Sequence, residues 1–365
     1  MKVDRLDVGV YTVPTEEPES DGTFTWTETT VVVAEPQAGG VTGLGFTYAT
    51  GACATLIRDV LADAVVGADP LDVPGVWSAM VGSIRNLGRP GVASMAIAAV
   101  DTALWDLKAR LLEQPLCRLL GMVHDQVAAY GSGGFTSLTD QQLVEQLTGW
   151  AQRDGIPRVK MKVGTAWGSR PDRDLERVGR VRAALGDGVE LYVDANGGYA
   201  RKQAVRLGRA FAAEGVTWFE EPVSSDDLEG LREVRDACGA DVAAGEYGYD
   251  LPYFRRMLEA GAVDCLQVDV SRCAGITEWQ RAAALAAAHN VQVSAHCAQS
   301  LTVHPAAATP NLRHLEYFAD HARVDRLLFD GVLEPAGGVL RPDLSRPGMG
   351  LELKRADANR YAEER

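Results

Sequence analysis

Three carboxylates recur at equal spacing along the chain. Asp194, Glu220 and Glu246 are 26 residues apart, since 220 − 194 and 246 − 220 both equal 26. Each acid ends a short apolar run, and a period in the twenties fits one strand, one helix and two loops. The three acids are therefore predicted at the carboxyl ends of successive parallel strands. Three carboxylate oxygens with no softer ligand nearby favour Mg²⁺.

Strand-like and helix-like segments alternate over the part of the chain that carries these acids. The predicted strands are Val127–Gly131, Arg158–Val163, Val189–Asp194, Val216–Glu220, Val242–Glu246, Val263–Asp269, Val291–His296 and Leu312–Glu316. Alternation of this kind predicts an α/β fold with parallel strands and crossover helices, and eight such units close into a barrel. The alternative is an open doubly wound sheet, which would require a dinucleotide fingerprint that Gly131–Gly134 does not supply.

Other predicted strands also end in ionisable side chains, and barrel enzymes place their active sites at that end. Lys160 and Lys162 alternate on the second strand, so both point into the barrel. Asp269, His296 and Glu316 end the sixth, seventh and eighth strands. Taken singly, an aspartate can cap a helix and a histidine can belong to the core. Charged groups on seven strands favour one site, because charges are seldom buried unless they are paired or bound to metal.

This set of groups suggests proton chemistry next to a carboxylate. A bound Mg²⁺ would clamp a substrate carboxylate and stabilise the enediolate formed when the adjacent carbon loses its proton. Lys162, next to Lys160 and a dication, is expected to have a lowered pKa and to act as a base. His296, oriented by Asp269, is the expected second acid or base. Glu316, if protonated, is expected to donate a hydrogen bond to the enediolate oxygen.

The ordered motifs resemble the mandelate racemase subgroup of the enolase superfamily, over essentially the whole chain. The segments that carry the resemblance are Ala98–Leu107, Lys160–Lys162, Val193–Asn196, Trp218–Pro222, Gly245–Glu246, Asp269, Ala295–His296 and Leu315–Glu316. The resemblance implies a modified TIM barrel, (β/α)₇β, with an N-terminal α+β capping domain that is completed by the C-terminal tail. It also implies Mg²⁺ on Asp194, Glu220 and Glu246, with Lys162 and His296 as opposed bases.

Three domains are expected, because the pattern of strand-like, helix-like and turn-rich segments changes along the chain. Residues 1–126 are predicted to form the capping domain, residues 127–329 the barrel, and residues 330–365 a turn-rich segment that packs on the capping domain. The tail has no expected partner strand in the barrel. The polar segment Pro14–Thr23 is predicted to be an exposed, mobile loop between two strands. A long helix is predicted over Val92–Leu112, with one apolar face.

The substrate is not given by the resemblance, because in such enzymes loops of the capping domain select it. The predicted substrate-binding residues are Asn196, Ser20, Asp21, Thr23, Trp26 and Tyr48. Polar lid residues would suit a sugar acid, whereas Phe24 and Trp26 leave an aryl substrate open. The leading hypothesis is an acid-sugar dehydratase that forms a 2-keto-3-deoxy acid. The alternatives are a racemase, epimerase or cycloisomerase of a hydroxy acid, and a non-catalytic barrel that binds acids.

Composition excludes several other classes. A net charge of −14 disfavours nucleic acid and anionic membranes as partners. No apolar stretch approaches the length of a membrane span, and the charged segment Met1–Val10 does not resemble a signal peptide. The six cysteines form no C-x-x-C pair, which argues against zinc and against a disulfide framework. The sequence therefore predicts a cytoplasmic homo-oligomer with a small-molecule carboxylic acid as its partner.

Overall fold

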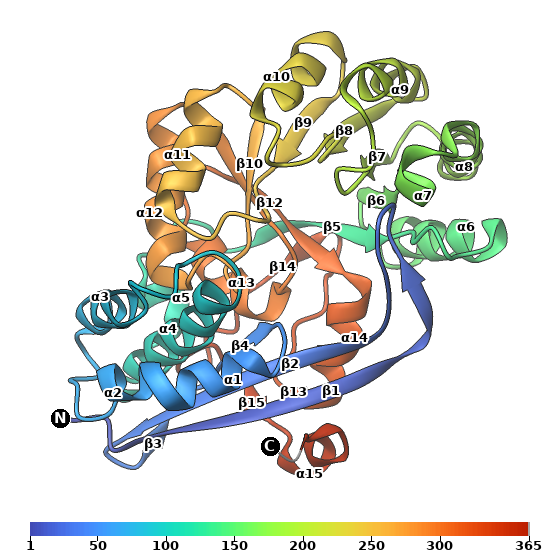
Figure 1. Ribbon diagram of the computed structural model, residues 1–365. Coiled ribbons are helices and arrows are strands. Elements are labelled where there is room, and N and C mark those ends of the chain that lie inside the picture. The colour runs from blue at the N-terminus through green and yellow to red at the C-terminus, as the bar shows by residue number, and fades with distance from the viewer. Residues whose placement is uncertain (364–365) are drawn as a thin grey trace.

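The computed structural model describes residues 1–363. The centre of this part of the chain is a closed barrel of parallel strands, each bonded to the next and the last to the first (Figure 1). The strands are β5 (Val127–Gly133), β6 (Arg158–Lys162), β7 (Glu190–Asp194), β8 (Val216–Glu220), β9 (Asp241–Ala244), β10 (Cys265–Val268), β11 (Gln292–Ala295) and β12 (Leu312–Phe318). Each overlaps its predicted segment, and the predicted modified TIM barrel with an N-terminal capping domain is confirmed.

Helices cover the outside of the barrel. The first, α6 (Asp140–Thr148), begins with a capping box between Thr139 and Gln142 and continues into the π-helical turn η2 (Gly149–Arg153). The other helices between the strands are α7 (Thr165–Gly168), α8 (Pro171–Leu185), α9 (Arg201–Ala213), α10 (Leu228–Ala237), α11 (Leu251–Glu259), α12 (Ile276–Ala288) and α13 (Gln299–Ala307). A further helix, α14 (Ala319–Leu328), follows the last barrel strand and was not predicted.

Aromatic side chains fill the barrel below the strand ends. Tyr130, Tyr192 and Trp218 are buried together, and the rings of Tyr192 and Trp218 stack with their centroids 5.5 Å apart. Asp194 and Glu220 lie two residues further along the same two strands, so their side chains point into the barrel as well. The packed layer therefore supports the acidic side chains from below and leaves them at the mouth.

The N-terminal unit packs an antiparallel sheet against helices. Its strands are β1 (Arg5–Ser20), β2 (Thr25–Ala38), β3 (Val41–Thr42) and β4 (Gly45–Tyr48). Its helices are α1 (Ala52–Leu56), η1 (Ile57–Leu61), α2 (Ala62–Val65), α3 (Val73–Ser83), α4 (Val92–Leu111) and α5 (Leu116–Leu119). The long helix α4 can approach β4 closely because Gly45 lacks a side chain, and a Cβ there would stand 2.4 Å from the Ala99 carbonyl oxygen. The predicted apolar face of α4 is buried.

Strands β1 and β2 form a long hairpin that extends to the barrel (Figure 1). The prediction of a loop over Pro14–Thr23 is wrong for residues 14–20, because these residues belong to β1. β1 pairs with β2 as far as Pro14, which lies opposite Glu28, and after one shift of register the pairing resumes with Glu19 opposite Trp26. β1 lies at the edge of its sheet, where proline can be accommodated without losing a ladder hydrogen bond. The proline and acidic residues of this segment are typical of an exposed loop, so the sequence did not indicate the strand.

The hairpin tip is held on loops of the barrel. The hydroxyl of Thr136, which follows β5, donates to the Asp21 carbonyl oxygen at 2.5 Å. The N–H of Trp167, in α7, donates to the Gly22 carbonyl oxygen at 2.9 Å. A Cβ on Gly22 would stand 2.5 Å from the Val163 carbonyl oxygen, so the close approach requires glycine. These contacts place the hairpin over the carboxyl ends of the strands.

The C-terminal tail contacts both other parts. Its strand β14 (Val339–Leu340) pairs antiparallel with β5, so the expectation that the tail lacks a partner strand in the barrel is wrong. A strand of two residues directly after Gly337-Gly338 is too short to show as a pattern in the sequence. The other tail elements are β13 (Phe329–Asp330), β15 (Glu352–Leu353), α15 (Arg355–Ala358) and η3 (Asn359–Tyr361). Arg355 pairs with Glu35 of β2 at 2.6 Å. The domain boundaries themselves stay predictions.

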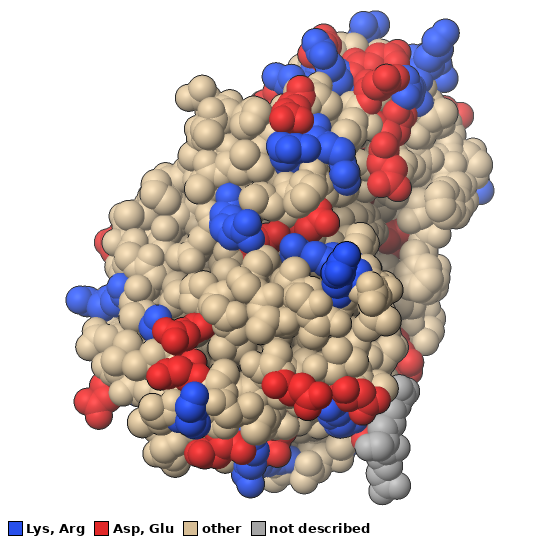
Figure 2. Space-filling view, turned by 60° about the vertical axis from the view of Figure 1, so that its left-hand side comes forward, with Lys and Arg blue, Asp and Glu red and all other residues tan. Residues whose placement is uncertain are grey.

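The surface carries charges of both signs. On the face shown in Figure 2, Lys and Arg side chains are interspersed with Asp and Glu. Ion pairs such as Arg232–Asp236 and Arg255–Glu259 link successive turns of α10 and α11. Among the helices of residues 1–363, none is long and apolar enough to cross a membrane.

Candidate active site

Three buried carboxylates meet at the mouth of the barrel. Asp194 ends β7, Glu220 ends β8 and Glu246 follows β9, and one oxygen of each lies within 4.8 Å of the others. Gly245 sets the turn before Glu246, since its φ is 132° and a Cβ would stand 2.2 Å from the Gln267 carbonyl oxygen. One oxygen of Glu246 has no hydrogen-bond partner among the described residues. Three oxygen donors at this separation fit Mg²⁺.

Two lysines of β6 pair with these carboxylates. The buried Lys160 ammonium lies 2.5 Å from Glu220 and 2.8 Å from Glu316. Lys162 lies on the same side of the strand and contacts Asp194 directly. Burial acts to lower the pKa of Lys162, but the charges of Asp194, Glu220 and Glu246 together outweigh burial and raise this pKa above its ordinary value. The chain's own charges therefore favour the Lys162 ammonium, and the lowering of its pKa expected beside a bound dication stays a prediction.

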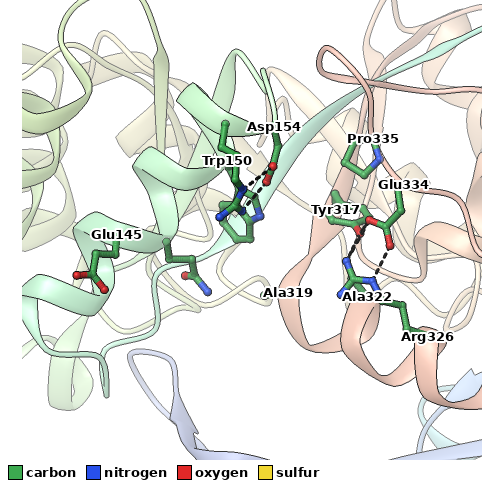
Figure 3. A pocket seen from close by; sticks show the side chains of 11 residues that line it. Glu145, Trp150, Asp154, Tyr317, Ala319, Ala322, Arg326, Glu334 and Pro335 are labelled. Atoms are coloured by element: carbon green, nitrogen blue, oxygen red, sulfur yellow. Dashed lines mark hydrogen bonds and ion pairs between the residues drawn. The ribbon is translucent and has the colours of Figure 1, made fainter.

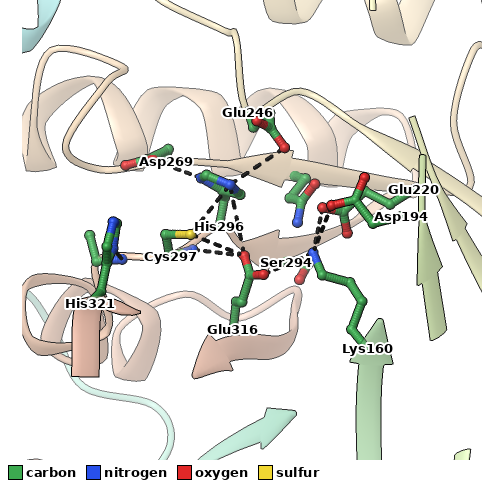
Figure 4. Close-up of polar contacts among 12 residues, drawn as sticks. Lys160, Asp194, Glu220, Glu246, Asp269, Ser294, His296, Cys297, Glu316 and His321 are labelled. Atoms are coloured by element: carbon green, nitrogen blue, oxygen red, sulfur yellow. Dashed lines mark hydrogen bonds and ion pairs between the residues drawn. The ribbon is translucent and has the colours of Figure 1, made fainter. Parts of the chain in front are cut away.

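An imidazole–carboxylate pair reaches the site from β10 and β11 (Figure 4). His296 donates from Nδ1 to Asp269 at 2.7 Å, and Asp269 also accepts from the N–H and the hydroxyl of Ser271, both at 2.7 Å. These bonds leave Nε2 of His296 facing Glu246, 3.4 Å away. Burial acts to lower the pKa of His296, whereas Glu246 and the bond to Asp269 raise it above its ordinary value. The structure thus brings the predicted pair together.

Glu316 lies between Lys160 and His296 (Figure 4). One of its oxygens is 2.8 Å from the Lys160 ammonium, and the other accepts the N–H of Cys297 at 3.0 Å. Burial acts to raise the pKa of Glu316, but the charges of Lys160 and His296 hold it well below its ordinary value. The chain's own charges therefore favour an ionised Glu316 that accepts hydrogen bonds, and the donor role expected of a protonated Glu316 stays a prediction.

One cavity of about 370 Å³ joins these groups to the hairpin. Lys162 lines it from β6 and His296 from the end of β11, so two groups that can exchange protons face the same space. The predicted substrate-binding residues that line it are Asp21, Thr23, Trp26, Tyr48 and Asn196. Ser20 is not part of the lining, because its hydroxyl is bonded to Thr25 at 2.8 Å on the hairpin.

Several residues of this cavity were not found by sequence analysis. Arg272 pairs with Glu246 at 3.1 Å and with Asp269 at 3.5 Å. Its position three residues after Asp269 is the feature of the sequence that could have identified it as a site residue. Asp320 and His321 reach the cavity from the unpredicted helix α14. Phe24 and Glu246, both named from the sequence, also line the cavity. The remaining lining residues are Glu28, Thr29, Thr30, Ala49, Tyr247, Cys297 and Phe318.

A larger cavity, about 700 Å³, lies on the flank of the barrel between η2 and α14 (Figure 3). Four of its charged side chains form ion pairs, Arg153 with Asp154 at 2.8 Å and Arg326 with Glu334 at 2.5 Å, and Glu145 accepts a hydrogen bond from Gln141 at 2.8 Å. It contains none of the predicted site residues. The ionisable groups capable of proton transfer therefore gather at the barrel mouth and not on this flank.

Comparison with known proteins places the chain in a family. The N-terminal domain of mandelate racemase / muconate lactonizing enzyme matches residues 6–121, and the enolase C-terminal domain-like family matches residues 142–358, which is more than half of the chain. The chain belongs to the mandelate racemase subgroup of the enolase superfamily. The resemblance inferred from the motifs is thereby confirmed.

Relatives within this superfamily have more than one activity. The 3,6-anhydro-alpha-L-galactonate cycloisomerase of Streptomyces coelicolor is 33% identical, over 96% of this chain and 97% of its own. The L-talarate/galactarate dehydratase of Salmonella typhimurium is 32% identical, over 90% of this chain and 81% of its own. Its crystal structure with Mg and L-lyxarohydroxamate superposes with a TM-score of 0.91, at 29% identity over 100% of this chain and 93% of that one.

A solved structure of higher identity comes from Rubrobacter xylanophilus. This mandelate racemase/muconate lactonizing enzyme-like protein has a TM-score of 0.96 and 53% sequence identity, with 100% of both chains covered. The described fold is therefore shared over the full length of both chains, hairpin included.

Proposed function

We propose that this protein is a Mg²⁺-dependent dehydratase of sugar acids. It removes the proton next to the substrate carboxylate and expels the hydroxyl on the following carbon, which yields a 2-keto-3-deoxy acid. The observation that carries the proposal is the placement of Lys162 and His296 on one cavity, beside three buried carboxylates. The talarate/galactarate dehydratase among the relatives supports it.

The proposed ligands of Mg²⁺ are Asp194, Glu220 and Glu246, because their oxygens lie close together and one of them lacks a hydrogen-bond partner among the described residues. When bound, the ion would polarise the substrate carboxylate and, by taking over Asp194 from the Lys162 ammonium, favour a neutral amine there. The substrate carboxylate is thus expected at this end of the cavity, where the ion and the Lys160 ammonium supply positive charge.

Lys162 and His296 are the proposed acid–base pair. One takes the α-proton, and the other gives a proton to the departing hydroxyl. Asp269 holds the imidazole with Nε2 toward the cavity and balances its charge when it is protonated. Glu316, ionised and bonded to a backbone N–H, keeps the Lys160 ammonium in place beneath the site.

A cycloisomerase is the second candidate, since a relative with that activity is 33% identical over 96% of this chain. The same two groups would move the α-proton while the substituent on the neighbouring carbon stays within the molecule. A racemase or epimerase would return the proton to the opposite face of the same carbon. The three outcomes share their residues and differ in the fate of that substituent.

A screen of sugar acids with Mg²⁺ tests the proposal. Semicarbazide detects the 2-keto product of dehydration, and parallel NMR in D₂O detects exchange of the α-proton. Keto product is the expected result, whereas exchange or inversion without it would favour an isomerase. Tight Mg²⁺-dependent binding of an acid with neither turnover nor exchange would indicate a non-catalytic barrel and overturn the proposal. The homo-oligomeric state and the cytoplasmic location stay predictions.

A further inference from the structure

The substrate cavity has two chemically different ends. At the metal end, Lys162 and Arg272 lie against the carboxylates that are the proposed Mg²⁺ ligands. The opposite end is built by β2, β4 and α14, and we name it the distal end. Its residues are Glu28, Thr29, Thr30, Tyr48, Asp320 and His321. In Figure 4, His321 lies on the side of the site away from Asp194 and Glu220.

The charged groups that face the distal end are acidic. Glu28 and Asp320 belong to it, and Asp21 on the hairpin tip is a third lining carboxylate outside the proposed Mg²⁺ ligands. Among the described residues, the lysine and arginine side chains in the lining are Lys162 and Arg272, and both are bound to carboxylates at the metal end. The distal end therefore offers a substrate no side-chain cation from the described lining.

A cation behind the distal end is already engaged. Arg323 donates to the Asp320 carboxylate at 2.7 Å and to the Pro14 carbonyl oxygen at 3.0 Å, and it does not line the cavity. Glu19, which accepts a hydrogen bond from the Trp26 indole at 3.0 Å, adds a further carboxyl group on the hairpin. Arg323 thus balances Asp320 from outside the lining and is not free to bind a substrate carboxylate.

The remaining distal groups are neutral and polar. The N–H of Ala298 donates to Nδ1 of His321 at 3.2 Å, which leaves the imidazole proton on Nε2, where it can be donated to a substrate oxygen. The ring stacks on Tyr48 with centroids 3.4 Å apart. Burial lowers the pKa of His321 to about 4, so the ring is neutral at neutral pH. The Thr29 hydroxyl donates to Asp320 and can still accept a hydrogen bond, so together with Nε2 of His321 this surface offers an acceptor and a donor to substrate hydroxyl groups.

We propose that the substrate is a monocarboxylic sugar acid, bound by its carboxylate at the metal end and by an uncharged polyhydroxyl chain at the distal end. The inference rests on the proposed function, since it takes a sugar acid to be held beside Mg²⁺. A second carboxylate at the distal end would face Glu28 and would find no free cation in the described lining, because Arg323 lies outside it and is already paired with Asp320. Like charges brought together oppose binding strongly. An aldonate or its cyclic anhydro form fits this cavity, and an aldarate does not.

Matched pairs of acids test this directly, because an aldonate and its aldarate differ only at the far carbon. Gluconate with glucarate and galactonate with galactarate are two such pairs, and the set should cover the configurations of five- and six-carbon acids. With the Mg²⁺-loaded full chain, kcat/KM for the aldonate of the preferred configuration is expected to exceed that for its aldarate at least about 100-fold.

The outcomes separate the two proposals. Equal or better use of aldarates would overturn the inference and leave the proposed dehydratase intact. No turnover and no α-proton exchange with either member of any pair would overturn the proposed function, and the inference with it.

A charge reversal at the distal end gives an independent test. Glu28 is exposed on β2 and lines the cavity, so Glu28→Lys should fold and should raise kcat/KM for the aldarate at least about tenfold. Glu17→Lys makes the same change at an exposed position of β1 outside the lining, and it should leave this value unchanged. Equal gains in both variants, or no gain in Glu28→Lys, would overturn the inference. Thermal melting confirms that both variants are folded.

Discussion

The two groups that can exchange protons with a substrate carbon reach one cavity from β6 and β11. Asp269 supports only one of them, by its 2.7 Å bond to Nδ1 of His296. Lys162 has no such neighbour and instead contacts Asp194, a proposed metal ligand. The two groups are therefore not equivalent, and their variants should fail at different steps.

We expect Lys162→Ala and His296→Asn each to lower turnover by about 10²–10⁴-fold, the usual contribution of general acid–base catalysis. If Lys162 takes the α-proton, His296→Asn still exchanges that proton with D₂O but does not release the hydroxyl. If His296 takes it, the pattern reverses. Asp269→Asn should resemble His296→Asn, because it removes the group that orients the ring. NMR of the α-proton measures exchange, and full turnover in both single variants would contradict the assignment.

The proposed metal ligands can be tested without activity. Mg²⁺ at about 100 times its Kd should stabilise the folded chain by about 2.7 kcal/mol, which appears as a higher Tm. Asp194→Asn, Glu220→Gln and Glu246→Gln should each lose most of this rise, since each removes one of three anionic ligands. Glu229→Gln, on the exposed surface of α10, is the matched control and should keep it. A ligand variant with the wild-type rise in Tm would be removed from the set.

At the scale of elements, the hairpin of β1 and β2 is the part of the N-terminal unit that meets the substrate cavity. It brings Asp21, Thr23 and Glu28 to the lining, and its tip is bonded to the loops that follow β5 and β6. The shape of the distal end thus depends on how closely the tip can sit against Val163, which only Gly22 permits.

Gly22→Val should therefore impair catalysis by displacing the hairpin. A Cβ there would stand 2.5 Å from the Val163 carbonyl oxygen, and overpacking of this kind usually costs about 1–3 kcal/mol. We expect kcat/KM to fall about tenfold or more, since about 1.4 kcal/mol corresponds to a factor of ten. Gly188→Val places the same side chain in open space and serves as the control. Wild-type kinetics in Gly22→Val would show that the close approach of the tip does not matter.

What the sequence could predict depended on local pattern. Asp194 and Glu220 were predictable because each ends a short apolar run, at a spacing that fits one strand and one helix. Helix α14 was missed because its inward face carries Asp320, His321 and Asp325, so the apolar period is broken. The pKa shifts of Lys162 and Glu316 could not be foreseen, because each depends on a side chain from another strand.

At the scale of the whole molecule, helix α4 joins the N-terminal unit to the barrel. Its buried Asp101 accepts hydrogen bonds from the N–H and the hydroxyl of Thr277, at the start of α12, at 2.9 and 2.6 Å. The indole of Trp77 adds a bond to the Ala274 carbonyl oxygen at 2.9 Å. These contacts help to hold the N-terminal unit, which carries the hairpin, against the barrel. Protonation of Asp101 should therefore affect the stability of the folded chain.

Burial raises the pKa of Asp101 to about 7, although its bonds to Thr277 act against the rise. In the unfolded chain an aspartate has a pKa of about 3.9. The folded chain therefore binds this proton more tightly, and the free energy of unfolding contributed by Asp101 decreases as the pH rises from about 4 to 7.

Asp101→Asn cannot titrate, so its free energy of unfolding should decrease less than that of the wild type between pH 5 and 8. One pKa unit is worth about 1.4 kcal/mol, so the difference should reach about 1 kcal/mol or more. Denaturant unfolding of both proteins at the two pH values measures it. Asp63→Asn is the control, because it removes an aspartate carboxylate from an exposed position of α2. If both variants altered the pH dependence equally, the raised pKa of Asp101 would not be its cause.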